Sequence, residues 1–176
     1  LVAFDLDQTA VSIHSRGRMR RGEALEKFMD KAVPAFVNRV PALYKAGFKL
    51  AIATHSEEAQ FDTTIGISRK THILGTELAQ ALLERYFEPE VVSAFDIVAY
   101  NPSARGTSNS ETDKIKRYHM RILREHFEID DPKHILFFDD TKSVVDDCED
   151  HCGVVAVHVN RKIGLQWSDI LRLREK

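Results

Sequence analysis

Two carboxylates follow the apolar run at the start of the chain. In the segment LVAFDLDQT, Asp5 and Asp7 are separated by Leu6. A buried strand that ends in acids delivers them to the edge where an open α/β sheet binds its ligands. The two side chains point the same way in a regular strand, and they fan around one point if the chain turns at Leu6. Either geometry suits a divalent cation with a reactive oxygen beside it.

Two later apolar runs also end in polar side chains. The run FKLAIAT ends in Thr54, and HILFFDD ends in Asp139 and Asp140. Between them, the segment TDKIK lies near the start of an expected helix and carries Lys114 and Lys116. Acids, a hydroxyl and a lysine gathered at strand ends can hold a cation and neutralise an anionic group.

The order of these elements resembles the haloacid dehalogenase-like (HAD) phosphohydrolases. That family has a DxDxT motif after its first strand, a Thr or Ser after a second, a Lys at the start of a later helix and acids after a further strand. DLDQT, IAT, TDKIK and FFDD match these motifs in order and span nearly the whole chain. The fourth motif is similar to that of the nearly capless magnesium-dependent phosphatases.

The resemblance implies a role for each acid. Asp5 is expected to be the nucleophile and to form an aspartyl phosphate. The Mg²⁺ ligands would be the Asp5 side chain, the Asp7 backbone carbonyl and the Asp140 carboxylate, with Asp139 a further ligand or acting through water. Asp7 would protonate the leaving oxygen and then activate water. Ion-pumping relatives have Thr at this place and dehalogenases lack the acid, so Asp7 favours phosphate monoester hydrolysis.

The resemblance also implies that Thr54 binds a phosphoryl oxygen and that a lysine neutralises the rest. Lys114 and Lys116 lie about 200° apart on a helix, so one of them is expected to face the site. We expect Lys116, because its distance along the chain to Asp140 is nearer that of the capless relatives. Gln8 stands where many relatives have Gly, which is a departure in the first motif.

Candidate substrate contacts flank the first two motifs. A basic stretch within a small flap over 10–22 contains Arg16 and Arg18, where relatives place a flap over the site. His55 and Ser56 directly follow the second motif and are placed to touch the substrate. The flap could grip a phosphorylated macromolecule. It could equally be a solvated loop, and His55 could simply cap a helix.

The elements that position these residues alternate along the chain. Apolar runs interleaved with helical periodicity predict an α/β fold: a doubly wound, mainly parallel five-stranded sheet with helices on both faces. The expected strands are Leu1–Phe4, Lys49–Ala53, Phe95–Tyr100, His134–Phe138 and Val154–Val159. The expected helices are Gly22–Asp30, Pro34–Ala46 with a kink or restart at Pro41, Thr76–Phe87, Glu111–Phe127, Ser143–His151 and Ser168–Arg174.

The lengths between the motifs leave room for a minimal cap. We expect one domain over 1–176, with the flap at 10–22 and a helical insertion at 62–90 that could act as a partial lid. An open mouth favours a bulky substrate such as a phosphoprotein or a nucleic-acid end. The chain starts inside its first strand without Met, which indicates that the numbering begins within a longer protein.

Composition narrows the class of partner. The 25 Lys and Arg against 27 Asp and Glu give a net charge of −2, which argues against a general nucleic-acid binder and allows nucleic acid only as a substrate. No apolar stretch reaches the roughly 20 residues needed to span a bilayer. We therefore expect a protein without a membrane partner in the cytoplasm or the nucleus, where Cys148 and Cys152 would stay reduced.

Other classes of function use similar residues. A receiver-type signalling domain also has acidic Mg²⁺ ligands, an aspartyl phosphate, Thr and Lys, but its paired acids come first along the chain. A non-catalytic HAD-shaped interaction module would lack a catalytic group, and none of the expected groups is missing here. Among enzymes, a small-metabolite phosphatase or a phosphomutase is the alternative to an enzyme acting on a macromolecule.

Overall fold

The computed structural model describes residues 1–55, 66–100, 112–166 and 168–169. A parallel five-stranded sheet forms its centre, with the strand order β5-β3-β1-β6-β7. Its strands are β1 (Val2–Phe4), β3 (Leu50–His55), β5 (Phe95–Tyr100), β6 (Leu136–Asp139) and β7 (Val155–His158). The expected doubly wound α/β sheet is confirmed, and each strand lies within two residues of its predicted position.

Burial on both faces explains why the strands read as continuous apolar runs. In β1, Ala3 lies opposite Ala51 of β3 and Phe137 of β6. Phe4 packs into the core on one face of the sheet, and Ala3 packs into the core on the other. The central strand that carries the first motif is therefore enclosed from both sides.

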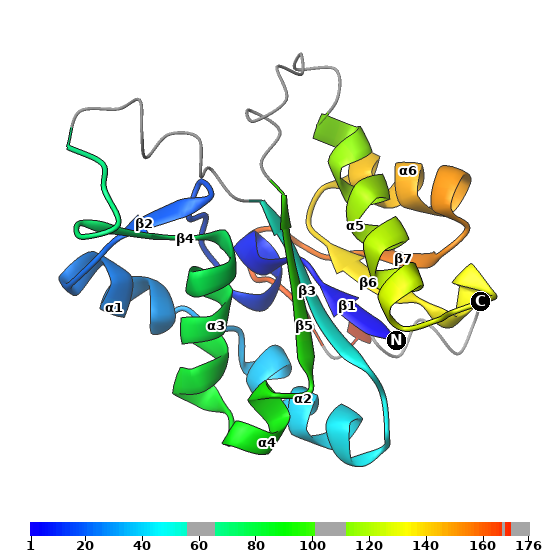
Figure 1. Cartoon of the computed structure of the whole chain (residues 1–176), viewed down its shortest axis with the longest axis horizontal. Coiled ribbons are helices and arrows are strands. Elements are labelled where there is room, and N and C mark those ends of the chain that lie inside the picture. The colour runs from blue at the N-terminus through cyan, green and yellow to red at the C-terminus, as the bar shows by residue number, and fades with distance from the viewer. Residues whose placement is uncertain (56–65, 101–111, 167, 170–176) are drawn as a thin grey trace.

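Helices cover the two faces of the sheet (Figure 1). On one face, Phe36 and Leu82 from two helices pack with Phe4, and on the other Leu123 and Cys148 pack with Ala3. The helices are α1 (Glu23–Met29), α2 (Pro34–Lys45), α3 (Gly75–Tyr86), α4 (Pro89–Val92), α5 (Thr112–His126) and α6 (Lys142–Cys152). The helix expected to restart at Pro41 is a single element through that residue. Of the predicted final helix, Ser168–Arg174, only residues 168–169 are described, and both are helical.

Aromatic rings hold the strand that leads to Asp5. The Phe4 ring meets Phe36 edge-on at a centroid distance of 5.2 Å and stacks on Phe138 at 5.5 Å. Such contacts add to the free energy gained by burying the rings. They couple β1 to α2 and β6 immediately before the acids that end β1 and β6.

A second, two-stranded sheet was not expected from the sequence. β2 (Arg18–Arg20) pairs antiparallel with β4 (His72–Leu74), which joins the basic flap to the segment just before α3. In Figure 1 this pair lies to one side of the large sheet, beside α1. Within the expected insertion at 62–90, residues 62–65 lie outside the described part, and α3 packs against β3 and β5. α3 therefore belongs to the main fold, and the flap and the segment before α3 form a separate small sheet together.

Candidate active site

Asp5 and Asp7 are brought together by a turn after β1. Asp5 is extended and buried, and its N–H donates to the Phe138 carbonyl at 2.8 Å. Residues Leu6–Ala10 then form an irregular helical turn in which Gln8 has a φ of 57°. This left-handed conformation favours glycine, which has no Cβ to clash there. The turn at Leu6 is thus the second of the two geometries that the spacing allowed.

Lys116 reaches the first acid from α5. Its Nζ donates to Asp5 Oδ1 at 2.5 Å and to the carbonyl oxygen of Ala53, and it lies 3.5 Å from Asp139 Oδ2. The side chain is buried, so these oxygens surround the ammonium away from solvent. Lys116 therefore contacts residues at the carboxyl ends of three neighbouring strands, β1, β3 and β6. The side chain of Lys114, the alternative, lies outside the described residues.

Burial and close charges shift the pKa values of this cluster. Burial raises the pKa of Asp5 to about 8, although the Lys116 ammonium opposes the shift. Burial alone would lower the pKa of Lys116, but the charges of Asp5 and Asp139 outweigh it and raise that pKa. Burial also raises the pKa of Asp139. Lys116 thus keeps its proton. Its positive charge favours the ionised, nucleophilic form of Asp5, against the effect of burial.

The two acids that end β6 face different partners. Asp139 accepts a hydrogen bond from the Thr141 N–H at 2.9 Å, and its other oxygen faces Lys116. Asp140 Oδ2 lies 3.9 Å from Arg161 Nε, and its backbone oxygen lies 3.0 Å from His158 Nε2. Neither contact was expected from the sequence. His158 ends β7 and Arg161 lies in the loop after it, and both meet Asp140 only in the folded chain.

The second motif ends β3 beside this cluster. Thr54 is buried in β3, and its hydroxyl lies 3.5 Å from the His55 carbonyl, a weak hydrogen bond. His55 is the last residue of β3 and is half-buried. Ser56, the neighbouring candidate, lies outside the described residues. Thr54 follows directly on Ala53, whose carbonyl accepts from Lys116.

The flap contacts Asp7 directly, which the sequence did not reveal. Ser15 Oγ donates to Asp7 Oδ2 at 2.8 Å, and His14 Nδ1 lies 2.6 Å from the same oxygen. The hydrogen bond that His14 donates to the Asp7 carboxylate raises the pKa of His14. The Arg16 N–H points at the same nitrogen, at 2.9 Å. His14 Nδ1 therefore either accepts from Arg16 or, when it carries a proton, donates to Asp7. The sequence predicted substrate contacts for the arginines of this basic stretch and did not mark His14 or Ser15.

The arginines expected to touch the substrate lie in and before β2. Arg16 is exposed and has a left-handed φ of 59°, directly after Ser15. Arg18 lies in β2 opposite Leu74. Arg21, just after β2, donates to the Arg69 carbonyl at 3.0 Å. This arginine therefore helps to hold the flap against the segment before β4.

The donor set suits a hard cation. Asp5 and Asp140 offer carboxylate oxygens, and the turn after Asp5 presents the backbone of Asp7. Among the described residues, no group of three His, Cys, Asp or Glu side chains is arranged as a ready metal cluster. Mg²⁺ is commonly bound by one or two carboxylates, with water and substrate phosphate completing its shell. These residues fit that mode of binding.

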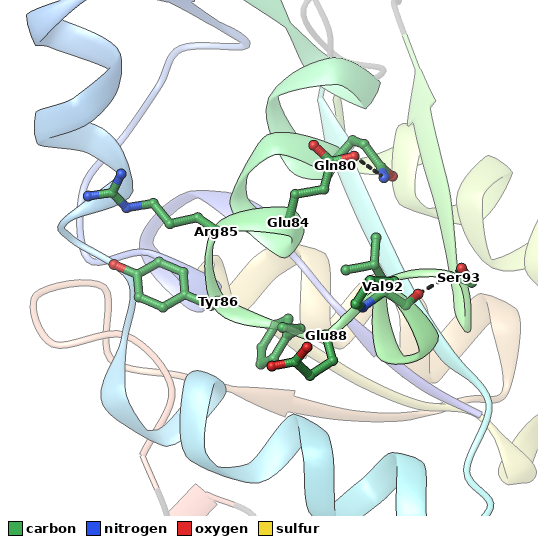
Figure 2. Close-up of a pocket in the computed structure, with 9 residues that line it drawn as sticks. Gln80, Glu84, Arg85, Tyr86, Glu88, Val92 and Ser93 are labelled. Atoms are coloured by element: carbon green, nitrogen blue, oxygen red, sulfur yellow. Dashed lines mark hydrogen bonds between the residues drawn. The ribbon is translucent and has the colours of Figure 1, made fainter.

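Two surface cavities differ in their relation to the acids. One of about 600 Å³ lies where α3 ends and α4 begins, and Figure 2 shows Arg85, Tyr86 and Glu88 around it. α4 precedes β5, so this cavity is far from the carboxyl ends of the strands. Another, of about 460 Å³, is lined by His158 and Arg161, both of which contact Asp140. The second cavity adjoins the candidate site.

No helix within the described ranges is both long and apolar enough to cross a membrane. No protein-family model matches the chain, and no curated protein matches it. The similarity found is therefore structural.

Three solved structures resemble the chain along most of its length. An uncharacterised protein from Listeria monocytogenes serotype 4b has a TM-score of 0.52 and 15% identity, covering 94% of this chain and 82% of that one. A Clostridium difficile protein, provisionally described as a phosphatase, has a TM-score of 0.50 and 16% identity, covering 97% and 89%. A haloacid dehalogenase-like hydrolase from Streptococcus pneumoniae has a TM-score of 0.48 and 14% identity, covering 97% and 89%. The first two show that the chain shares the fold of these proteins.

Proposed function

We propose that this chain is a HAD-type phosphatase, a hydrolase of phosphate monoesters that works through an aspartyl phosphate on Asp5. The observation that carries the proposal is the buried contact of Lys116 with Asp5, with Asp139 beside the same ammonium. Asp7 lies on the turn that directly follows Asp5. A nucleophile, an acid and a fixed positive charge are the groups that phosphoryl transfer requires.

In the first step, a carboxylate oxygen of Asp5 attacks phosphorus. The bond between phosphorus and the leaving oxygen breaks, and Asp7 gives that oxygen its proton. Lys116 and Thr54 stabilise the negative charge on the remaining phosphoryl oxygens. Burial of Lys116 makes this stabilisation strong, because water does not screen the ammonium there.

In the second step, the acyl phosphate on Asp5 is hydrolysed. Asp7, now ionised, accepts a proton from water, and the water oxygen attacks phosphorus. Inorganic phosphate leaves, and the carboxylate of Asp5 is restored. The same side chain thus serves first as acid and then as base, which requires it to hold one position through both steps.

Asp5, Asp140 and the Asp7 backbone carbonyl would hold Mg²⁺, with Asp139 as a further ligand or acting through water. When bound, the ion supplies positive charge that offsets repulsion between the acids and an anionic phosphate. Asp5, Asp139 and Asp140 are all buried. The side chains would otherwise bring several negative charges to a site that must accept another.

We propose a bulky substrate, such as a phosphorylated protein or a nucleic-acid end. The flap and the β2–β4 pair would form only a small lid, and Arg16 and Arg20 on it are exposed. A large substrate would complete the enclosure that a full lid gives a small molecule. Negatively charged groups of the substrate around its phosphate would contact the basic flap.

Hydrolysis of 4-nitrophenyl phosphate tests the proposed reaction. Purified protein should release 4-nitrophenolate with Mg²⁺, lose this activity in EDTA and regain it when Mg²⁺ is restored. Acid-quenched wild-type protein should carry phosphate on Asp5, located by peptide mass spectrometry, and Asp5→Asn should carry none. Full activity after rigorous chelation would contradict the metal assignment. A phosphoenzyme formed by Asp5→Asn would contradict the choice of nucleophile.

A further inference from the structure

Asp7 has one oxygen held by the flap and one that is not. Its Oδ2 accepts a 2.8 Å hydrogen bond from Ser15 Oγ and lies 2.6 Å from His14 Nδ1. Its Oδ1 is buried and has no hydrogen-bond partner within the described residues. A buried carboxylate oxygen without a partner costs free energy unless another group comes to meet it. In this place, that group would be the leaving oxygen of a substrate.

Ser15 is well placed to orient this side chain. It is only 6% exposed, and its Oγ accepts a 3.0 Å hydrogen bond from the Gly17 N–H while donating to Asp7. The acceptance from Gly17 fixes the hydroxyl, so its proton is directed at Asp7. A side chain held by one oxygen has little freedom to rotate, and its other oxygen keeps a fixed direction.

The flap in turn is held by pairing with a distant segment. Residues of β2 pair with β4, and the Arg21 N–H donates to the Thr71 carbonyl at 2.8 Å. Arg21 and Arg69 both form ion pairs with Glu77 at the start of α3. Because α3 packs on the large sheet, these contacts tie the position of Ser15 to the same framework that carries Asp5.

We infer that Ser15 is a positioning residue, which anchors Asp7 through Oδ2 and leaves Oδ1 to exchange the proton with the leaving oxygen. The inference rests on the proposed phosphatase function. It assigns to the flap a part in proton transfer, in addition to any contact of its arginines with substrate.

The consequence depends on the leaving group. 4-Nitrophenolate leaves readily and needs little help from an acid, whereas an alkoxide needs a proton as the bond breaks. Loss of the Ser15 hydroxyl should therefore slow the cleavage of an alkyl phosphate more than that of 4-nitrophenyl phosphate. A defect in folding or in general packing would slow both esters alike. The ratio of the two kcat/KM values separates these cases, because kcat/KM covers the step in which the leaving group departs.

The experiment compares wild type, Ser15→Ala, Ser15→Thr and Ser12→Ala on 4-nitrophenyl phosphate and on an alkyl phosphate. Ser12 is the matched control, because it lies on the same segment and its hydroxyl contacts the Lys31 carbonyl. Ser15→Ala should lower kcat/KM for the alkyl ester about tenfold more than for the aryl ester. Ser15→Thr, which keeps the hydroxyl, should restore the wild-type ratio, and Ser12→Ala should leave it unchanged.

Ser15→Cys covers the case in which Ser15→Ala does not fold. It keeps the size of the side chain but offers only a weak S–H donor, so it should shift the ratio in the same direction. Equal losses on both esters, or no loss, would overturn the role of Ser15 while leaving the proposed function intact. A wild-type protein that hydrolyses neither ester would overturn the proposed function, and the role of Ser15 with it.

Discussion

Lys116 balances the charge of the site through contacts with Asp5, Asp139 and the Ala53 carbonyl. Removing one partner of a buried ion pair leaves the other charge uncompensated, which commonly costs about 3–5 kcal/mol. Lys116→Gln should therefore lower both the free energy of unfolding and kcat/KM, the latter by at least about 100-fold. Lys114→Gln is the matched control and should retain activity, as measured by urea unfolding and by hydrolysis of an aryl phosphate. Equal effects of the two variants would contradict the choice of Lys116.

Gln8 adopts a backbone conformation that costs free energy. Its φ of 57° lies in the left-handed region, where a side chain with Cβ is disfavoured by about 1–2 kcal/mol. Gln8→Gly should keep the free energy of unfolding within about 1 kcal/mol of wild type, because relieved strain offsets the added freedom of the unfolded chain. Gln8→Val should lower it, since β-branched residues avoid this region most strongly. Urea unfolding of both variants checks the prediction, and a Val variant as stable as the Gly variant would contradict it.

At the scale of elements, an ion pair joins α5, which carries Lys116, to α6, which follows Asp140. Arg117 of α5 contacts both carboxylate oxygens of Asp147 in α6, with Nε at 2.7 Å from Oδ2. The hydrogen bonds from Arg117 hold the pKa of Asp147 below its usual value. A carboxyl group with a lowered folded pKa stabilises the fold above its unfolded pKa of about 3.9, and loses this effect as pH falls through the folded value.

Asp147→Asn should therefore lower the Tm by a few degrees at pH 7. The difference from wild type should shrink toward zero as the pH falls below about 4, because the wild-type carboxyl then takes up its proton. Asp146→Asn is the control: its partner Lys142 lies on the same helix, and both side chains are substantially exposed. Thermal unfolding, followed by circular dichroism at pH 7 and at a pH below about 4, gives the measurement. A Tm difference that stayed constant with pH would show that the charge of Asp147 is not its source.

The elements also show what the sequence could predict. The five strands of the large sheet could be predicted, because strands buried on both faces are unbroken apolar runs such as Leu50–Ala53. β2 was not, since Arg18-Met19-Arg20 has no apolar run and forms a strand only by pairing with His72–Leu74. Local pattern carries little information about such a distant partner. The short strands depend on the tertiary structure for their existence.

The candidate site likewise contains residues that the sequence predicted and some that it did not. Asp5, Asp139 and Lys116 were expected together, because acids at strand ends and a lysine at a helix start recur in a recognisable order. Ser15 was missed, because neither its residue type nor its spacing from Asp7 marks a contact between them. That contact arises from the turn after β1 and the return of the flap, which depend on backbone conformation and not on a periodic pattern.

At the scale of the whole molecule, a net charge of −2 means that attraction for an anionic substrate must be local. The flap carries positive charge beside the site: Arg16 and Arg20 are exposed there, while Arg21 is engaged with Glu77 and the Arg69 carbonyl. Replacing Arg21 would therefore disturb the attachment of the flap as well as its charge. The exposed pair alone tests substrate attraction without loosening the β2–β4 sheet.

The double variant Arg16→Gln, Arg20→Gln should raise KM for a phosphorylated protein or nucleic-acid end about tenfold at low salt, and less at high salt, because the lost attraction is electrostatic. Its kcat on 4-nitrophenyl phosphate should change less than about twofold, since neither residue lies in the cluster around Lys116. The double variant Lys45→Gln, Lys49→Gln removes the same charge near the amino end of β3 and should leave both substrates unaffected. A metabolite-sized phosphate turned over with a kcat/KM far above that of any phosphoprotein or nucleic-acid end would overturn the bulky-substrate proposal.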